Sequence, residues 1–303
     1  MKTLITGAKG FVGQHLTEYL RYKDYELYTS SRSFGNADIE LDLKDYTKAK
    51  NILDNYKFDV IFHLSAQSSV HRSFQKPFNT MEDNIISTLN LLKIVHELNL
   101  ETKVVIAGTS EIYKTSVKPM SEESAIEPRS PYTVSKLAID YFTRVIAEHL
   151  NINVTVLRLF NHTGPGQSTE FVLSSFAQQL AMIKLDKQEN VIKVGNLEVQ
   201  RDFTDVRDVV RAYDLVCKEK EYGECYNVCS NNAYNISDLL SKLIEISNLD
   251  VKVEVDSSRL RANDIPYYYG NYDKILAKHG WMPEIPIHKT LEDLYVYWLN
   301  QCK

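Results

Sequence analysis

The sequence predicts an α/β protein built on a doubly wound parallel sheet, with a smaller, mainly C-terminal lobe. Short apolar runs alternate with amphipathic stretches through residues 1–160. Runs such as Val60–Leu64 are apolar on both faces, which is typical of a parallel sheet covered by helices on each side. After Phe160 the chain becomes richer in loops, with turn signals such as Gly164–Gly166 and Gly195–Asn196.

Each apolar run in the first part has the length of one strand. The expected strands are Thr3–Thr6, Tyr25–Ser30, Val60–Leu64, Val104–Gly108 and Asn153–Phe160. The helices expected between them are Phe11–Tyr22, Tyr46–Tyr56, Asn84–Leu98 and Pro131–His149. Repeated βα units joined by right-handed crossovers produce a doubly wound sheet.

The second part alternates loops with helices, expected at Phe171–Ile183 and Ile236–Ser247. The apolar segment Glu224–Cys229 is expected to return to the main sheet as a strand. The boundary between residues 1–160 and 161–303 is therefore expected to be discontinuous. The later residues should form most of a lobe that closes over the carboxyl edge of the sheet.

Composition narrows the class of protein. The 303 residues carry a net charge of −5, which argues against a partner that is a nucleic acid or a membrane surface. No apolar run approaches the roughly 20 residues of a membrane span, and the start Met-Lys-Thr enters a strand directly, so no signal peptide is expected. The four cysteines lack partners at ligand spacing, so we expect free thiols, no metal site and a cytoplasmic location.

Three glycines follow the first strand and open the first helix. Gly7 would permit a tight turn, Gly10 would let backbone approach a pyrophosphate, and Gly13 would allow close packing of helix on strand. A helix N-terminus offers unpaired N–H groups to phosphate oxygens. The order strand, glycine turn, helix therefore predicts a dinucleotide site.

Tyr132 and Lys136 stand four residues apart in S-P-Y-T-V-S-K, so both should lie on one face of a helix. Ser130 is expected to cap that helix and Pro131 to be its first residue. The helix dipole and the lysine charge both favour the phenolate, so the pKa of Tyr132 is expected to be lowered. The pair predicts a group that transfers a proton.

The G-x-x-G-x-x-G spacing, taken with Tyr-x-x-x-Lys, resembles the extended short-chain dehydrogenase/reductase family. This resemblance implies a Rossmann domain over residues 1–160 and a substrate-binding lobe in most of 161–303. It implies that a hydroxyl at Thr109 steadies the reacting oxygen while Tyr132 moves the proton, and that Asn84 supports the lysine. The cofactor contacts that it implies, besides the glycines, Asn84, Tyr132 and Lys136, are Phe11, Val12, Asp42, Leu43, Leu64 and Ala66.

The choice of cofactor is expected to depend on the end of the second strand. The segment Tyr28–Ser33 has hydroxyls and Arg32 where NAD-preferring sites usually carry a carboxylate. A guanidinium is well suited to a 2′-phosphate, so we expect NADP(H) to be preferred and NAD(H) to be tolerated.

The second half resembles enzymes that modify nucleotide sugars, through F-N-H-T-G-P-G-Q, V-G-N-L-E and R-D-F-T-D-V-R-D. With S-P-Y-T-V-S-K, these phrases resemble the GDP-4-dehydro-6-deoxy-D-mannose reductases, which make GDP-D-rhamnose for surface polysaccharide. The resemblance implies a GDP-sugar substrate and a homodimer paired through Asn84–Leu98 and Pro131–His149. The substrate contacts that it implies are Ser68, Ser110, Glu111, Asn161, Val194, Asn196, Arg201 and Arg261.

Three functions remain open. GDP-mannose 4,6-dehydratases share A-Q-S and T-S-E, and in them the counterpart of Glu111 takes a proton from C5. The reductases also keep a glutamate at this position, so Glu111 does not decide between the two. A reductase consumes its cofactor, whereas a dehydratase or a 4-epimerase recycles it; the chain length favours the reductase, because dehydratases are usually longer. A non-catalytic dinucleotide-binding protein is disfavoured because Thr109, Tyr132 and Lys136 are all present. Lys114 departs from both families, which usually have glycine at this position, so the identity of the sugar substrate stays undecided.

Overall fold

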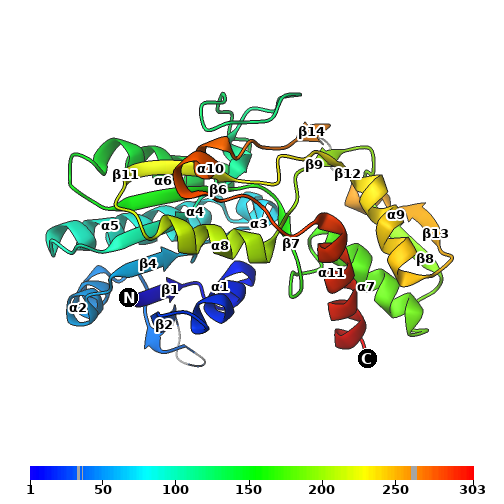
Figure 1. The fold of residues 1–303 in the computed structure, drawn as a ribbon, viewed down its shortest axis with the longest axis horizontal. Coiled ribbons are helices and arrows are strands. Elements are labelled where there is room, and N and C mark those ends of the chain that lie inside the picture. The colour runs from blue at the N-terminus through cyan, green and yellow to red at the C-terminus, as the bar shows by residue number, and fades with distance from the viewer. Residues whose placement is uncertain (33–34, 36, 261–264) are drawn as a thin grey trace.

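We describe the protein from a computed structural model that covers residues 1–303 apart from 33–34, 36 and 261–264. Among the described residues, seven strands form one sheet in the order β3-β2-β1-β4-β5-β6-β11, and each neighbouring pair is parallel (Figure 1). The strands are β1 (Lys2–Thr6), β2 (Glu26–Ser31), β3 (Ile39–Glu40), β4 (Val60–His63), β5 (Lys103–Ala107), β6 (Val154–Leu159) and β11 (Tyr222–Val228). The predicted Rossmann fold class is confirmed.

Helices cover both faces of this sheet because successive strand residues point to opposite sides. Leu4 belongs to the apolar core under the helices of one face, and its neighbour Ile5 to the core under the other. One face carries α2 (Tyr46–Tyr56), α5 (Ser87–Glu97) and α6 (Pro131–Ile146). The other carries α1 (Phe11–Arg21), α8 (Val206–Val216) and α10 (Asp273–His279).

A separate lobe has its own apolar core. It is formed by α7 (Val172–Lys184), β8 (Val191–Val194), α9 (Ile236–Ser247), β13 (Lys252–Val255) and α11 (Ile287–Gln301). Leu180, Ile192 and Leu294 are fully buried at its centre. Figure 1 shows the lobe beside the large sheet, with β7 (His162–Thr163) between them. β7 pairs with β10 (Thr204–Asp205), and β9 (Gln200–Arg201) lies between β12 (Tyr234–Asn235) and β14 (Tyr267–Tyr268).

More of the second half joins the main sheet than the single strand that the sequence suggested. Besides β11, helix α8 and the buried Trp281 belong to the sheet's second core. Asp205 begins α8 by accepting a hydrogen bond from the amide of Arg207 at 2.8 Å. The motif R-D-F-T-D-V-R-D therefore contributes to two short strands, β9 and β10, and to the start of helix α8 on the sheet.

Several short helices were not anticipated. They are α3 (Val70–Gln75), α4 (Pro77–Met81), the π-helix η1 (Glu82–Ile86) and the 3₁₀ turns η2 (Ser110–Ile112) and η3 (Ser257–Arg259). η1 occupies the first turns of the helix that we expected to begin at Asn84. None of the helices in the described part of the chain is long and apolar enough to cross a bilayer.

Candidate active site

The glycine turn after β1 is shaped to hold a dinucleotide. Gly7 has φ of +72°, and a Cβ there would lie 2.7 Å from the backbone nitrogen of Ser65. Gly10 donates its amide to the Gly7 carbonyl at 2.9 Å, and no side chain caps α1 behind it. A Cβ on Gly13 would lie 2.7 Å from Ala8 Cα, so helix and turn pack backbone against backbone. The turn and the uncapped helix end fit a pyrophosphate.

A cavity of about 350 Å³ opens at the carboxyl ends of β1, β2 and β4. Ligands of open α/β sheets bind at this edge. Its lining includes seven of the residues predicted to bind cofactor: Gly7, Gly10, Arg32, Asp42, Leu43, Leu64 and Ala66. Phe11, Val12, Gly13, Asn84, Tyr132 and Lys136 do not line it.

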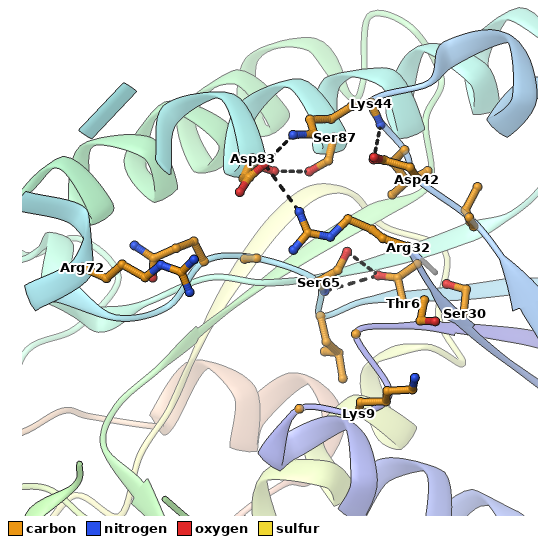
Figure 2. Close-up of a pocket in the computed structure, with 18 residues that line it drawn as sticks. Thr6, Lys9, Ser30, Arg32, Asp42, Lys44, Ser65, Arg72, Asp83 and Ser87 are labelled. Atoms are coloured by element: carbon orange, nitrogen blue, oxygen red, sulfur yellow. Dashed lines mark hydrogen bonds and ion pairs between the residues drawn. The ribbon is translucent and has the colours of Figure 1, made fainter. Parts of the chain in front are cut away.

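Two cations meet one carboxylate across this cavity (Figure 2). Lys44 Nζ lies 2.6 Å from Asp83 Oδ1, and a guanidinium nitrogen of Arg32 lies 3.7 Å from the same atom. The hydrogen bond to Asp83 raises the pKa of Lys44. The lining also contains Lys9 and Arg72, so cations outnumber carboxylates around the space. Sequence reasoning identified only Arg32: Lys9 occupies an unspecified position of the glycine motif, and no motif marked Lys44 or Arg72.

The helix that carries Tyr132 begins as expected. Ser130 accepts from the amide of Thr133 at 3.1 Å, Thr133 Oγ1 accepts from the amide of Ser130 at 2.9 Å, and Pro131 is the first helical residue. Farther along, Asp140 is bound to the buried Arg158 of β6 through two hydrogen bonds of 2.8 and 2.7 Å. This pair fixes the helix on the sheet, and no sequence motif indicated it.

Tyr132 is 8% exposed, and a hydrogen bond with Thr109 acts on the pKa of its phenol. Its pKa is raised, chiefly by burial and then by the charge of Glu111, while the bond to Thr109 opposes the shift. The expectation of a lowered pKa was therefore wrong for the protein alone. The cause is burial, a tertiary property that the local pattern does not contain.

Lys136 lies one helical turn beyond Tyr132, and its ammonium donates to the Ala107 carbonyl oxygen at 2.7 Å. Burial lowers the pKa of Lys136 to about 8. The ammonium is thus held by the end of β5. Burial, and then the charge of Lys136, lower the pKa of the nearby His63 to about 3.

Asn84 joins the cavity lining to the catalytic helix. Its side chain donates to Ser135 Oγ at 2.8 Å and to the Gln67 carbonyl at 3.1 Å, and it accepts from the Gln67 amide at 2.8 Å. It lies in η1, and π-helical turns often occur at functional sites. Within the described part of the chain its side chain bonds to Gln67 and Ser135, so it is linked to Lys136 through α6, the helix that contains both Ser135 and Lys136.

The 3₁₀ turn η2 carries Glu111 beside the phenol. Thr109 caps this turn by accepting the amide of Glu111 at 3.3 Å. Ser110 is buried, whereas Glu111 is exposed and acts on the pKa of Tyr132 through its charge. A hydroxyl, a phenol and a carboxylate therefore converge at the carboxyl end of β5.

The remaining substrate candidates are spread over several segments. Arg201 lies in β9 and donates to the carbonyl oxygens of Gln200 and Ile265, at 2.9 and 2.5 Å. Asn161 follows β6, and its carbonyl accepts from the Thr204 amide at 3.0 Å. Val194 is buried at the end of β8, Asn196 is half-buried, Ser68 is exposed, and Arg261 lies outside the described residues.

The two halves touch where α1 begins. The ring of Phe11 stacks on His162 at a centroid distance of 5.9 Å, and His15 is hydrogen-bonded to the Pro165 carbonyl at 2.7 Å. The segment F-N-H-T-G-P-G-Q is thus in direct contact with the helix that follows the glycine turn.

A glycine cradle, a cavity at the carboxyl ends of parallel strands, and a buried tyrosine one helical turn from a lysine define a dinucleotide-dependent oxidoreductase of the extended short-chain type. The chain belongs to the GDP-mannose 4,6 dehydratase family, whose profile matches residues 4–294.

Relatives in this family catalyse more than one reaction. The chain is 31% identical to a GDP-6-deoxy-D-mannose reductase of Pseudomonas aeruginosa, covering 100% of this chain and 98% of that protein. It is 28% identical to GDP-mannose 4,6 dehydratase 1 of Arabidopsis thaliana, covering 95% and 87%. The structure of RMD from Pseudomonas aeruginosa complexed with NADPH superimposes with a TM-score of 0.86 at 30% identity, covering 99% of each chain.

Proposed function

We propose that the protein is an NADP(H)-dependent reductase of a GDP-4-keto-6-deoxy sugar, of the type that converts GDP-4-dehydro-6-deoxy-D-mannose to GDP-D-rhamnose. The observation that carries the proposal is the buried phenol of Tyr132, which interacts with Thr109. The phenol carries its proton at neutral pH, as a group that donates a proton to O4 must. The similarity to the reductase of Pseudomonas aeruginosa also supports reduction as the reaction.

In this proposal Tyr132 gives its proton to O4 as the carbonyl becomes an alcohol. Bound NADPH supplies the hydride that C4 receives. Thr109 holds the same oxygen, and the bond between Thr109 and the phenol stabilises the phenolate left behind. Lys136, held by Ala107, provides the positive charge that favours phenolate and would bind the cofactor's ribose hydroxyls.

The adenosine end of the cavity supports a preference for NADP(H), with NAD(H) tolerated. Arg32 and Lys44 both face Asp83 there, and a 2′-phosphate would find a guanidinium that is 68% exposed. The relative described with NADPH has the same overall fold. For the substrate, we propose that Arg201 and Arg261 grip the diphosphate, with Asn161, Val194 and Asn196 nearby, and that Ser68, Ser110 and Glu111 face the sugar.

A 4,6-dehydratase is the second candidate, and Glu111 is the observation that favours it. Its carboxylate acts on Tyr132 and is exposed at the end of β5, where it could take a proton from C5 of a sugar. A dehydratase, like a 4-epimerase, returns its cofactor to the starting state, so net consumption of NADPH separates these reactions from a reductase.

The experiment that tests the proposal offers GDP-mannose and a panel of nucleotide 4-keto sugars with NADPH or NADH. We expect stoichiometric loss of reduced-nicotinamide absorbance with a GDP-4-keto-6-deoxy sugar, and a product identified by NMR as reduced at C4. Ketone formation from GDP-mannose without consumption of NADPH would instead establish the dehydratase.

The variant Tyr132→Phe should lower turnover by at least about 100-fold, the contribution typical of general acid catalysis, and leave nucleotide affinity nearly unchanged. Tyr22→Phe is the control, because Tyr22 is 86% exposed and lies outside both the site and the proposed dimer face. Turnover of Tyr132→Phe at the level of this control would exclude the role assigned to Tyr132.

We also propose a homodimer, in which a second copy covers an apolar face of α4, η1 and α6. The exposed apolar side chains there are Phe78, Ile86, Val134, Tyr141, Phe142 and Val145. A cytoplasmic location and a role in supplying surface polysaccharide complete the proposal. The four cysteines are free, and free thiols are typical of proteins in a reducing compartment.

A further inference from the structure

Tyr268 connects the strand beside Arg201 to the turn that carries the reacting groups. It lies in β14, is 5% exposed, and its hydroxyl donates to the carbonyl oxygen of Ser110, 158 positions earlier in the chain. No motif marked it. The contact depends on two segments that meet only in the folded molecule.

On one side of this contact is the turn η2. The carbonyl oxygen of Ser110 also accepts the amide of Tyr113 at 2.9 Å, and Thr109 caps the turn through the amide of Glu111. Ser110 therefore lies in the chain between Thr109 and Glu111, the two residues that act on the pKa of Tyr132. Any displacement of the Ser110 carbonyl would move both of its neighbours.

On the other side is β9. Tyr268 is in register with Arg201, and its carbonyl accepts the amide of Asp202 at 2.9 Å. The buried carboxylate of Asp202 in turn accepts the amides of Ser230 at 2.7 Å and Gly270 at 3.2 Å. Figure 1 shows β14 and β9 side by side, above the lobe and next to the large sheet.

The surroundings of Tyr268 are apolar and charged at once. Burial raises the pKa of its phenol, the charge of Glu111 adds to this shift, and the charge of Arg201 opposes it. The ring itself packs at a tilt on Phe160, with centroids 5.6 Å apart. Tyr268 is thus held by packing, by its strand and by its hydroxyl at once.

We infer that Tyr268 is a positioning residue that fixes the Thr109–Glu111 turn relative to β9. Binding of a substrate diphosphate at Arg201 then holds Thr109 and Glu111 at the correct distance from the reacting carbon of the sugar. Binding energy from the remote part of a substrate can orient reacting groups in this way. The inference rests on the proposed use of Arg201 and Thr109, and it applies to reduction, dehydration and epimerisation alike.

The test compares Tyr268→Phe with Tyr269→Phe. The two tyrosines are adjacent, and Tyr269 also donates to a backbone carbonyl, that of Val117 at 3.1 Å, but not in the catalytic turn. The assay is whichever of the three reactions the wild-type enzyme catalyses, so failure of the reductase proposal does not prevent the test. Each variant keeps its ring, and thermal unfolding sets an assay temperature at which both are folded.

For Tyr268→Phe we expect kcat to fall by about 10- to 100-fold, since a displacement near 1 Å can cost that much. KM for the nucleotide sugar and the Kd for GDP should change less than about twofold, because Arg201 keeps its place in β9. The deuterium isotope effect on kcat, measured with deuterium at the transferred position, should rise above its wild-type value, as the chemical step becomes slower. Tyr269→Phe should resemble the wild type in all four quantities.

Two results would overturn the inference. In the first, Tyr268→Phe and Tyr269→Phe have the same kcat. In the second, kcat of Tyr268→Phe falls only in proportion to a loss of folded protein, with no change in the isotope effect, which is what a purely structural residue would give.

Discussion

Lys136 has an ammonium group that burial makes easy to neutralise. Its pKa is lowered to about 8, so the group is charged below that pH and neutral above it. Because the charged form would bind the cofactor's ribose, we expect the Kd for NADPH to rise as pH increases through 8. The increase should be at most about tenfold per pH unit, the limit for loss of one proton. Fluorescence titration of NADPH from pH 6.5 to 9.5 measures it.

Lys136→Met is the control for this titration, because it removes the titrating group and leaves a chain of similar length. Its affinity should be lower than that of the wild type at pH 7 and constant between pH 7 and 9. A wild-type affinity that stays constant over the same range would contradict the assignment of the charge to Lys136.

At this scale the sequence indicated candidate groups but not their electrostatics. Tyr132, Lys136 and Thr109 could be proposed from spacing and from a family phrase, and in the structure Thr109 acts on the pKa of the Tyr132 phenol. The direction in which the pKa of Tyr132 shifts could not be predicted from the sequence, because it depends chiefly on burial and not on the local helix dipole. Tyr268 could not be found at all, since its partner Ser110 is distant in sequence.

Among the elements, the glycine turn before α1 allows two roles of glycine to be separated. Gly13→Ala would push a Cβ against the backbone of Ala8 inside the protein, so both stability and cofactor affinity should fall. A Cβ at Gly10 has only the Gly7 carbonyl oxygen within 4 Å, at 3.2 Å. This contact is tight, so Gly10→Ala should lower the free energy of unfolding by about 1 kcal/mol, less than Gly13→Ala, whose Cβ would overlap backbone atoms.

Gly10→Ala should still weaken NADPH binding by about tenfold or more, because a methyl group would stand where backbone must approach the pyrophosphate. Denaturant unfolding and NADPH titration of the two variants provide the comparison. Equal losses of stability in both would show that Gly10, too, serves packing rather than the ligand.

Element boundaries followed the sequence closely where one pattern decided them. The helices Tyr46–Tyr56 and Ile236–Ser247 begin and end as predicted. The prediction failed where tertiary contacts decide. η1 departs from regular helix beside Asn84, whose side chain bonds two other segments. β3 has two residues, too few to show an alternating pattern. The start of α8 lies within R-D-F-T-D-V-R-D, which we interpreted as a substrate motif, so the helix was not predicted.

For the whole molecule, the proposed dimer gives a measurable consequence. Val145 is 73% exposed within the apolar face on α6, so Val145→Glu would place a charge inside the expected interface. We expect light scattering to give twice the mass of one chain for the wild type and a single chain for this variant at low micromolar concentration. The control Val296→Glu changes a valine that is 53% exposed on α11, in the lobe, and should leave the mass unchanged.

The position of β11 beside β6 also has a consequence for folding during synthesis, because the main sheet cannot be completed until β11 has been translated. β6 ends at Leu159, yet the neighbour that covers its outer side is not translated until Val228. Until then the edge of β6 exposes unpaired backbone amides and carbonyls. Such an edge can pair with strands of other chains and so start aggregation. Nascent chains halted between these two points should consequently depend more on chaperones than the full chain does.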